Sequence, residues 1–266
     1  STGQTSAQIA VSPGVSTTYT VTVSEQGCFS TATTTVDVNQ SPATSAGEDQ
    51  QICDGASAQL VATGLSGPGE YTWSTGETGD EITVDPLSTT TYSVTATNEF
   101  DCASTDEVVV TVNPIPLANA GPDQDLCEGG TATLNASGGS VNSTYIWSSG
   151  QTGQSIQVSP GMSTTYTVTL TDAGCPDTDD IEITVLPSPI ASASDDIEIC
   201  AGATASLEAS GGLTYLWSTG QNTSLVDVTP LVSTTYIVTV FSSNGCSDTE
   251  EVIVSVNPAP IANAGP

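Results

Sequence analysis

The chain has 266 residues, no lysine, arginine or histidine, and 30 aspartate and glutamate residues, which gives a formal net charge of −30. Without cationic side chains it cannot neutralise phosphate groups, so nucleic acid and anionic lipid headgroups are excluded as partners. No apolar run approaches the length of a membrane span, so we expect no direct insertion into a membrane.

A repeat runs through the whole chain. Successive tryptophans lie 74 and 70 residues apart, and tyrosines recur in step with them. This period predicts the C-terminal half of one repeat at 1–41, whole repeats at 42–114, 115–187 and 188–258, and the first residues of another at 259–266. We therefore expect the array to continue in a longer chain.

The elements are easiest to predict in the repeat at 115–187, where apolar and polar residues alternate. In chain order the alternation predicts strands at 131–137, 144–148, 155–158, 164–170 and 179–185, with turn residues between them. In 164–170, for example, Tyr166, Val168 and Leu170 should face a core while the threonines between them face water. No segment has helical periodicity. The fold class expected is all-β, a tandem array of small antiparallel β-sandwiches.

One tryptophan and one tyrosine recur at fixed places as core candidates: Trp73, Trp147 and Trp217, and Tyr19, Tyr92, Tyr166 and Tyr236. In the immunoglobulin sandwich a tryptophan on the third strand is buried, and a tyrosine near the start of the penultimate strand makes a corner hydrogen bond. We expect both structural roles here and no ligand platform.

Short joints with two prolines, at 112–116, 185–189 and 256–260, connect the repeats. Proline fixes φ and favours a stiff, extended path. The prediction is that consecutive domains follow one another end to end as an extended rod.

The phrases ANAGPDQDLCEGGTATLNASGG, YIWSSGQTG and STTYTVTLTDAGC within 118–175 carry a family resemblance. They resemble the tandem immunoglobulin-like and PKD-like repeats of Bacteroidota cell-surface adhesins and gliding-associated proteins, which are exported by type IX secretion. The resemblance covers the whole chain and implies small immunoglobulin-like, PKD-like or fibronectin-III-like domains at the cell surface. It does not separate spacers, adhesive modules and filament bodies from one another.

Seven cysteines form two series, one before the second strand and one before the last: Cys53, Cys127 and Cys200, and Cys28, Cys102, Cys175 and Cys246. With no histidine and no Cys-x-x-Cys motif, zinc binding and redox catalysis are poor explanations, and disulfides are expected.

Two connectivities remain open for these cysteines. Each domain could contain its own disulfide, namely Cys53–Cys102, Cys127–Cys175 or Cys200–Cys246. In a seven-strand sandwich, however, the two turns lie at opposite ends, which favours cross-joint pairs Cys53–Cys175 and Cys127–Cys246. The choice depends on a short extra edge strand between Trp73 and Ile82. If that strand is missing, the two turns lie at the same end of the sandwich, and the within-domain pairs become possible again. We favour the cross-joint pairs.

Acidic residues gather in the first strand and at the start of the last. Calcium takes six to eight oxygen ligands, so weak calcium candidates are the first-strand carboxylates Asp49, Asp123, Asp125, Asp195 and Asp196. The alternative, which we favour, is solvated charge that protects sheet edges from aggregation. No other cofactor is expected.

Catalysis needs a tuned acid or base, an activated nucleophile or a metal, and identical modules without a unique pocket offer none of these. The sequence therefore predicts no enzyme. It predicts a disulfide-stabilised structural stalk or filament segment of a large bacterial surface protein, extracellular and attached to the cell surface. Its partners would be neighbouring repeats and like chains. The alternative is a glycan- or protein-binding module of an adhesin.

Overall fold

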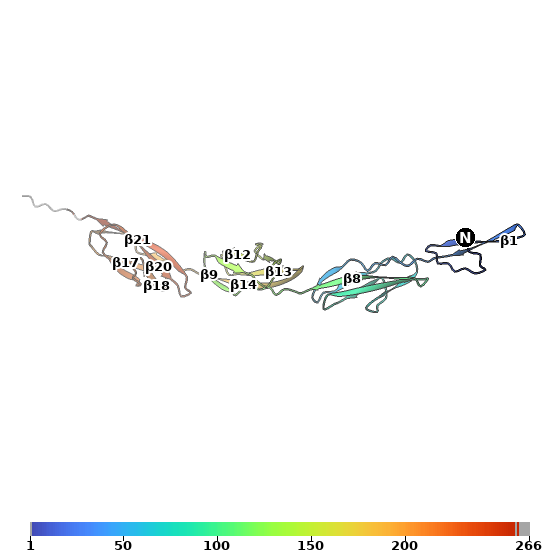
Figure 1. Ribbon diagram of the computed structural model, residues 1–266. Helices are drawn as coiled ribbons and strands as arrows, with labels where there is room; N and C mark the ends of the chain where they lie inside the picture. The colour runs from blue at the N-terminus through green and yellow to red at the C-terminus, as the bar shows by residue number, and fades with distance from the viewer. Residues whose placement is uncertain (1, 259, 261–266) are drawn as a thin grey trace, which may run out of the picture. The chain divides into compact units, whose positions relative to one another are not determined.

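The computed structural model describes residues 2–258 and 260, and every regular element within them is a β-strand. The expected start of a further repeat at 259–266 lies outside the described residues, apart from residue 260. The chain divides into two compact units, Ser1–Ile115 with Ala173–Cys175, and Pro116–Asp172 with Pro176–Pro266. Figure 1 labels strands of both units.

The first unit holds a hairpin and one sandwich. The hairpin consists of β1 (Thr17–Glu25) and β2 (Cys28–Val36). The sandwich strands are β3 (Gln50–Cys53), β4 (Ala58–Val61), β5 (Gly69–Trp73), β6 (Glu81–Val84), β7 (Thr90–Asn98) and β8 (Ala103–Asn113).

The second unit holds most of two further sandwiches. The strands of the first are β9 (Gln124–Cys127), β10 (Ala132–Asn135), β11 (Thr144–Trp147), β12 (Ser155–Val158), β13 (Thr164–Asp172) and β14 (Cys175–Leu186). The strands of the second are β15 (Ser192–Ala193), β16 (Ile197–Cys200), β17 (Ala205–Ser210), β18 (Thr214–Trp217), β19 (Leu225–Val228), β20 (Thr234–Phe241) and β21 (Ser247–Asn257).

Each sandwich pairs a four-stranded sheet with a smaller one. The larger sheets have the orders β3-β8-β7-β5, β11-β13-β14-β9 and β16-β21-β20-β18, and the smaller ones are β4-β6, β10-β12 and β15-β17-β19. Among the described residues the edge pairs β3–β8, β9–β14 and β16–β21 are parallel, whereas pairs such as β4–β6, β5–β7 and β7–β8 are antiparallel. The prediction of an all-β fold with tandem immunoglobulin-like sandwiches is confirmed by this arrangement.

The first strand of each sandwich is divided between the two sheets. Its beginning bridges the second strand, through Ser45 and Thr63 or Asn119 and Ser137, before the chain crosses to the parallel edge. At Gly138 the passage is close, because an added Cβ would lie 1.8 Å from the carbonyl oxygen of Leu117, and φ is +109°. Only glycine fits there without rearrangement.

The short edge strand expected between Trp73 and Ile82 is reduced to one bridge, Thr72 to Thr78. The chain nevertheless reverses there, since Trp73 N donates to Glu77 O at 2.9 Å and Gly79 N to Tyr71 O at 3.0 Å. The bridged segment thus takes the place of a strand: the chain turns back after Trp73 and turns again before β6, so that β6 runs antiparallel to β4.

The three tryptophans lie at the centres of the cores, no more than 2% exposed. Each indole Nε1 donates a hydrogen bond of 3.0 Å to a backbone carbonyl six residues on: Trp73 to Gly79, Trp147 to Gly153 and Trp217 to Thr223. The indole is thus buried with its one polar atom hydrogen-bonded, which offsets the loss of its hydrogen bond to water.

The tyrosines differ from the expectation in two ways. Tyr92 and Tyr236 are buried, but Tyr166 is half-buried at the edge of its core, and Tyr19 is half-buried on a hairpin that no second sheet covers among the described residues. Nor does the described part of the chain give the hydroxyls of Tyr92, Tyr166 and Tyr236 a protein hydrogen bond. The corner hydrogen bond expected of these tyrosines is therefore not seen in the described residues.

A different tyrosine, two residues before each tryptophan, does bond to the backbone through its hydroxyl. Leu65 N donates to the hydroxyl of Tyr71 at 2.9 Å, and Gly139 N to that of Tyr145 at 3.2 Å. The hydroxyl of Tyr215 donates to Gly212 O at 3.1 Å. These bonds close the loop between the second and third strands, a role that alternation alone does not reveal.

Candidate functional site

The two cysteine series lie at opposite ends of the last strand of a sandwich. Cys53 ends β3 and is in register with Asn113, the final residue of β8, whereas Cys102 directly precedes β8. Strand β8 has 11 residues, and at about 3.3 Å per residue Cys53 and Cys102 lie roughly 35 Å apart. A disulfide needs Cα atoms within about 7 Å, so the two cannot bond.

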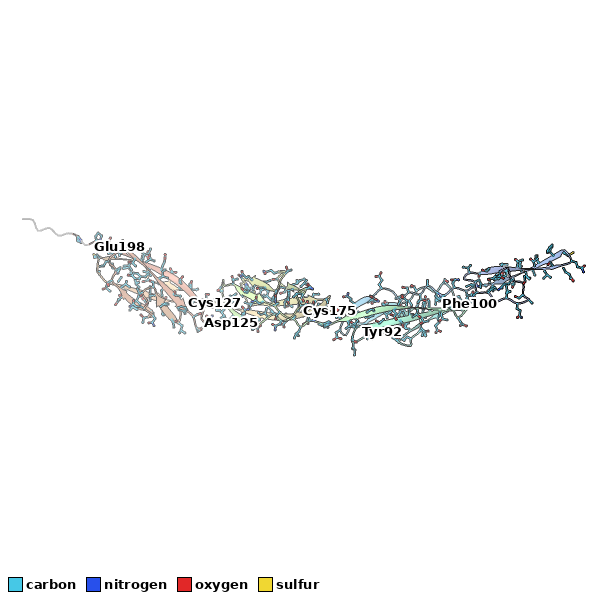
Figure 2. The ribbon with its side chains drawn as sticks, viewed as in Figure 1. Tyr92, Phe100, Asp125, Cys127, Cys175 and Glu198 are labelled. Atoms are coloured by element: carbon cyan, nitrogen blue, oxygen red, sulfur yellow. A yellow bond between two sulfur atoms is a disulfide. The ribbon has the colours of Figure 1, made fainter. Side chains whose placement is uncertain are left out.

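The structure contains two disulfides, Cys53–Cys175 and Cys127–Cys246, each with a Cα–Cα distance of 5.6 Å. Each joins the parallel edge strand of one sandwich to the start of the last strand of the sandwich that follows in sequence. These are the two cross-joint pairs. The within-domain pairs Cys53–Cys102, Cys127–Cys175 and Cys200–Cys246 are not formed. Figure 2 labels Cys127 and Cys175, which belong to different bridges and are not bonded to each other.

The two bridges have the same surroundings. The sulfur of Cys175 lies 3.9 Å from the carbonyl oxygen of Asn113, and that of Cys246 lies 3.9 Å from the carbonyl oxygen of Leu186. Cys175 and Cys246 are 1% and 0% exposed. The same surroundings at both joints make the bridge a repeated structural element of this chain.

Three cysteines are unpaired: Cys28 and Cys200, which are exposed, and Cys102, which is half-buried. Cys102 is held like its bonded counterparts, because its sulfur lies 3.7 Å from the carbonyl oxygen of Asn39. Cys200 ends β16 in register with Asn257, the position of Cys53 and Cys127 in their sandwiches.

Three of the calcium candidates accept backbone hydrogen bonds. Asp49 Oδ1 accepts from Val109 N, Asp123 Oδ1 from Glu182 N and Asp196 Oδ1 from Ile253 N, each at 2.8 Å. Each aspartate directly precedes the parallel edge strand. Its carboxylate therefore adds one more hydrogen bond between that strand and the last strand of the sandwich. Asp125, also labelled in Figure 2, and Asp195 are exposed and make no protein contact of this kind among the described residues.

The acidic residues at the start of the last strand have a similar task. Asp106 Oδ2 accepts from Ala46 N at 2.9 Å, Asp179 Oδ2 from Ala120 N at 2.8 Å and Asp248 Oδ2 from Ala191 N at 2.9 Å. The backbone hydrogen bonds from Ala191 and Thr249 lower the pKa of Asp248. Solvated edge charge is therefore an incomplete description, because these carboxylates satisfy amides of the first strand.

With no cationic side chain in the sequence, backbone amides and hydroxyls are the main donors open to these carboxylates. Within residues 2–258 and 260, no three histidine, cysteine, aspartate or glutamate side chains gather as a metal site would require. The same residues contain no helix long and apolar enough to cross a membrane.

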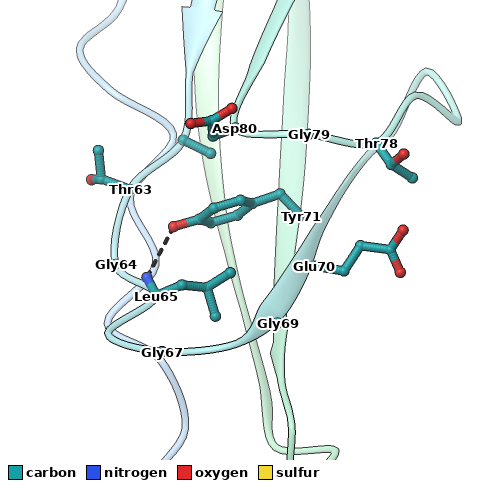
Figure 3. A pocket seen from close by; sticks show the side chains of 11 residues that line it. Thr63, Gly64, Leu65, Gly67, Gly69, Glu70, Tyr71, Thr78, Gly79 and Asp80 are labelled. Carbon is teal, nitrogen blue, oxygen red and sulfur yellow. Dashed lines mark hydrogen bonds between the residues drawn. The ribbon is translucent and has the colours of Figure 1, made fainter.

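A shallow groove recurs beside the loop-closing tyrosine. In the first sandwich it has a volume of about 670 Å³ and lies between Thr63, Tyr71 and Asp80. Figure 3 shows the Tyr71 hydroxyl pointing across it to Leu65 N. The corresponding groove beside Tyr145 has a volume of about 570 Å³. Neither contains a nucleophile with an activating base.

No protein-family model matches the chain, and no curated protein matches it. Solved structures with tandem immunoglobulin domains do. The I67–I69 fragment of titin in an E-to-A mutated variant is 12% identical, with 79% of this chain and 96% of that chain covered and a TM-score of 0.41. The N-terminal eight immunoglobulin domains of Down Syndrome Cell Adhesion Molecule are 14% identical, with 91% and 40% covered and a TM-score of 0.42.

A third structure, Dpr2 Ig1-Ig2 in complex with DIP-Theta Ig1-Ig3, is 12% identical, with 79% and 97% covered and a TM-score of 0.30. The assignment of the fold rests on the strand order of the chain itself.

Proposed function

We propose that the chain is a non-catalytic, load-bearing segment of an extracellular surface protein, the stalk or filament body of a bacterial adhesin or appendage of the Bacteroidota type. The observation that carries the proposal is the pair of cross-sandwich disulfides in the same register. Structural disulfides form and persist in oxidising compartments outside the cytosol, which supports an extracellular location. The family resemblance of the repeats supports attachment to the cell surface.

The disulfides change the covalent route by which a pulling force crosses the chain. Cys53–Cys175 closes a loop of 122 residues and Cys127–Cys246 one of 119, and the two loops overlap over residues 127–175. The shortest covalent route from one end to the other passes through residues 1–53, 127–175 and 246–266. Residues 54–126 and 176–245 lie outside it and carry no load when the chain is fully extended.

This route is short. It contains about 120 residues and extends to roughly 400 Å, whereas the reduced chain of 266 residues extends to roughly 900 Å, at about 3.3–3.6 Å per residue. An array bridged in this way resists lengthening even when its sandwiches unfold. Resistance of that kind suits a stalk under tension and offers no benefit to a free binding domain.

Single-molecule force spectroscopy tests the proposal, with handles at the two ends of the chain. The oxidised chain should reach a final contour length of roughly 400 Å, and the Cys53→Ser variant, which retains one loop, roughly 500 Å. Reductant should raise both to roughly 900 Å. Equal contour lengths before and after reduction would show that the disulfides carry no load and would contradict the proposal.

The alternative is a glycan- or protein-binding module. The grooves beside Tyr71 and Tyr145 favour it, because each is lined by glycines, an aromatic ring and polar groups. Substitution of Tyr71 and Tyr145 by alanine, followed by a screen on immobilised glycans against the unaltered chain, tests it. Loss of a specific glycan signal would support binding, and the absence of any signal in the unaltered chain would argue against it.

A further inference from the structure

The hairpin β1–β2 leaves exposed the side chains that form the core in the complete sandwiches. Val21 and Val23 are 58% and 63% exposed. Their counterparts one repeat later, Val94 and Ala96, are 0% exposed. The corresponding pairs in the other sandwiches are equally buried: Val168 and Leu170, and Val238 and Val240. The hairpin therefore presents an uncovered core face.

The outer edge of β2 is also open among the described residues, where β2 pairs with β1 alone. Its counterparts β8, β14 and β21 each pair on that edge with a parallel strand that ends in a cysteine. In that register Cys53 lies beside Asn113, and the counterpart of Asn113 in the first repeat is Asn39. A parallel strand added to β2 would thus place its cysteine beside Asn39.

Cys102 already lies at this point. Its sulfur is 3.7 Å from the carbonyl oxygen of Asn39, close to the 3.9 Å between the bonded Cys175 and Asn113. The side-chain amide of Asn98 donates a hydrogen bond of 2.9 Å to the next backbone carbonyl, that of Gln40. Near the bonded Cys246, the side-chain amide of Asn244 donates an equivalent hydrogen bond of 3.0 Å to the carbonyl oxygen of Pro187. The thiol of Cys102 is therefore held in the pose of a bonded cysteine.

We propose that the hairpin β1–β2 and Cys102 together form an acceptor site for a segment of the same repeat type, with the strand and cysteine pattern of residues 42–73. The segment would cover Val21 and Val23, add a parallel strand to β2 and form a third cross-sandwich disulfide with Cys102. The inference extends the proposed function, because it adds a joint of the same kind.

The bond forms by thiol–disulfide exchange. Two thiols, that of Cys102 and that of the incoming cysteine, lose two protons and two electrons and become one S–S bond. A low-molecular-weight disulfide, such as oxidised glutathione in the experiment, accepts both electrons and is released as two thiols. Cys102 is half-buried and thus remains open to this exchange.

A chain extended at its N-terminus tests the proposal. A copy of residues 42–73 is placed before Ser1, so that the copied tryptophan is followed by Ser1 as Trp73 is followed by Ser74. This junction keeps the repeat, since residues 2–5 (Thr-Gly-Gln-Thr) match residues 75–78 (Thr-Gly-Glu-Thr). The control variant carries serine in place of the copied cysteine. Both are oxidised with glutathione, alkylated with iodoacetamide and mapped by mass spectrometry.

In the extended chain, alkylation of Cys102 should be lost and a peptide linking it to the copied cysteine should appear. Cys28 and Cys200 should stay alkylated as internal controls. In both variants, amide hydrogen exchange at Val21 and Val23 should slow at least tenfold against the unextended chain, because the added strands cover them.

Three outcomes would overturn the proposal: full alkylation of Cys102 in the extended chain while Cys127–Cys246 forms, unchanged exchange at Val21 and Val23, or a dimer linked through Cys102 of two chains. None of them bears on the proposed function, which depends only on Cys53–Cys175 and Cys127–Cys246. Failure of either idea can thus be told from failure of the other.

Discussion

The sulfur of Cys175 lies 3.9 Å from the carbonyl oxygen of Asn113, the residue that ends the last strand of the preceding sandwich. The contact follows from the parallel register of β3 and β8, which sets Cys53 beside Asn113. The parallel edge strand therefore decides which cysteines can form a disulfide. It places its terminal cysteine at the end of the sandwich where the chain leaves it. The following sandwich supplies the partner.

The carboxylate of Asp123 should contribute measurably to stability. Replacement by alanine removes the acceptor for Glu182 N at the edge of the sheet. Because the site is exposed and water can substitute, we expect a loss of about 1 kcal/mol in the free energy of unfolding. Urea denaturation of Asp123→Ala measures it. The matched control is Asp125→Ala, two residues further along the chain, for which we expect a change within about 0.5 kcal/mol. Equal effects of the two would refute the assigned role.

The two tyrosine positions can be separated by removal of the hydroxyl alone. Tyr71→Phe loses the bond from Leu65 N and should cost about 1 kcal/mol. Tyr92→Phe removes a hydroxyl without a protein partner and should leave the urea midpoint nearly unchanged. The expectation of a corner bond at Tyr92 predicts the reverse order, so the two midpoints decide between them.

Stability should fall in acid through Asp248. Its hydrogen bonds from Ala191 and Thr249 lower the pKa in the folded chain below the ordinary value of 3.8. The group therefore stabilises the fold above pH 3.8, and this contribution disappears as the pH falls through the lowered pKa.

Asp248→Asn isolates this contribution from the general effect of discharging a polyanion. The difference in thermal midpoint between the unaltered chain and Asp248→Asn should be constant at neutral pH and shrink below pH 3.8. Glu250→Gln, which removes one charge from the same strand, is the control. A difference that grows with acidification would contradict the assignment.

Much of the fold could be predicted from alternation. The strands expected at 144–148, 155–158 and 164–170 correspond to β11, β12 and β13 within two residues at each end. The strand expected at 179–185 begins earlier, at Cys175, because its first residues are polar and carry no alternating signal. The tryptophan core could be predicted for the same reason, since a sandwich strand must turn its large apolar side chains towards the facing sheet.

The roles of polar groups could not be predicted in this way. Whether Asp123 binds a metal, faces water or accepts an amide depends on which backbone donor the parallel register brings to it. The loop-closing tyrosines were missed because Tyr71 and Tyr92 look alike in sequence. The signal that could have identified them is their place two residues before a tryptophan that must point inward.

The protection given by the disulfides is measurable with proteases. The sequence has no lysine or arginine, so trypsin should leave the chain intact even after reduction and unfolding. An acid-directed protease should cut the folded, oxidised chain more slowly than the reduced one, because the bridges restrict local opening. Equal cutting rates would show that the disulfides do not protect the fold.

The most direct test of the cross-joint connectivity uses a single engineered trypsin site in the joint. Leu117 is 81% exposed, so Leu117→Lys creates one cleavable bond, between residues 117 and 118, without disturbing a core. The variant is unfolded in urea with free thiols blocked, cut with trypsin and run on a gel with and without reductant.

Because Cys53–Cys175 spans the cut, we predict one band of full mass without reductant. With reductant the same sample should give two bands, residues 1–117 and 118–266. Two bands without reductant would mean that no disulfide crosses the joint, and would contradict the account.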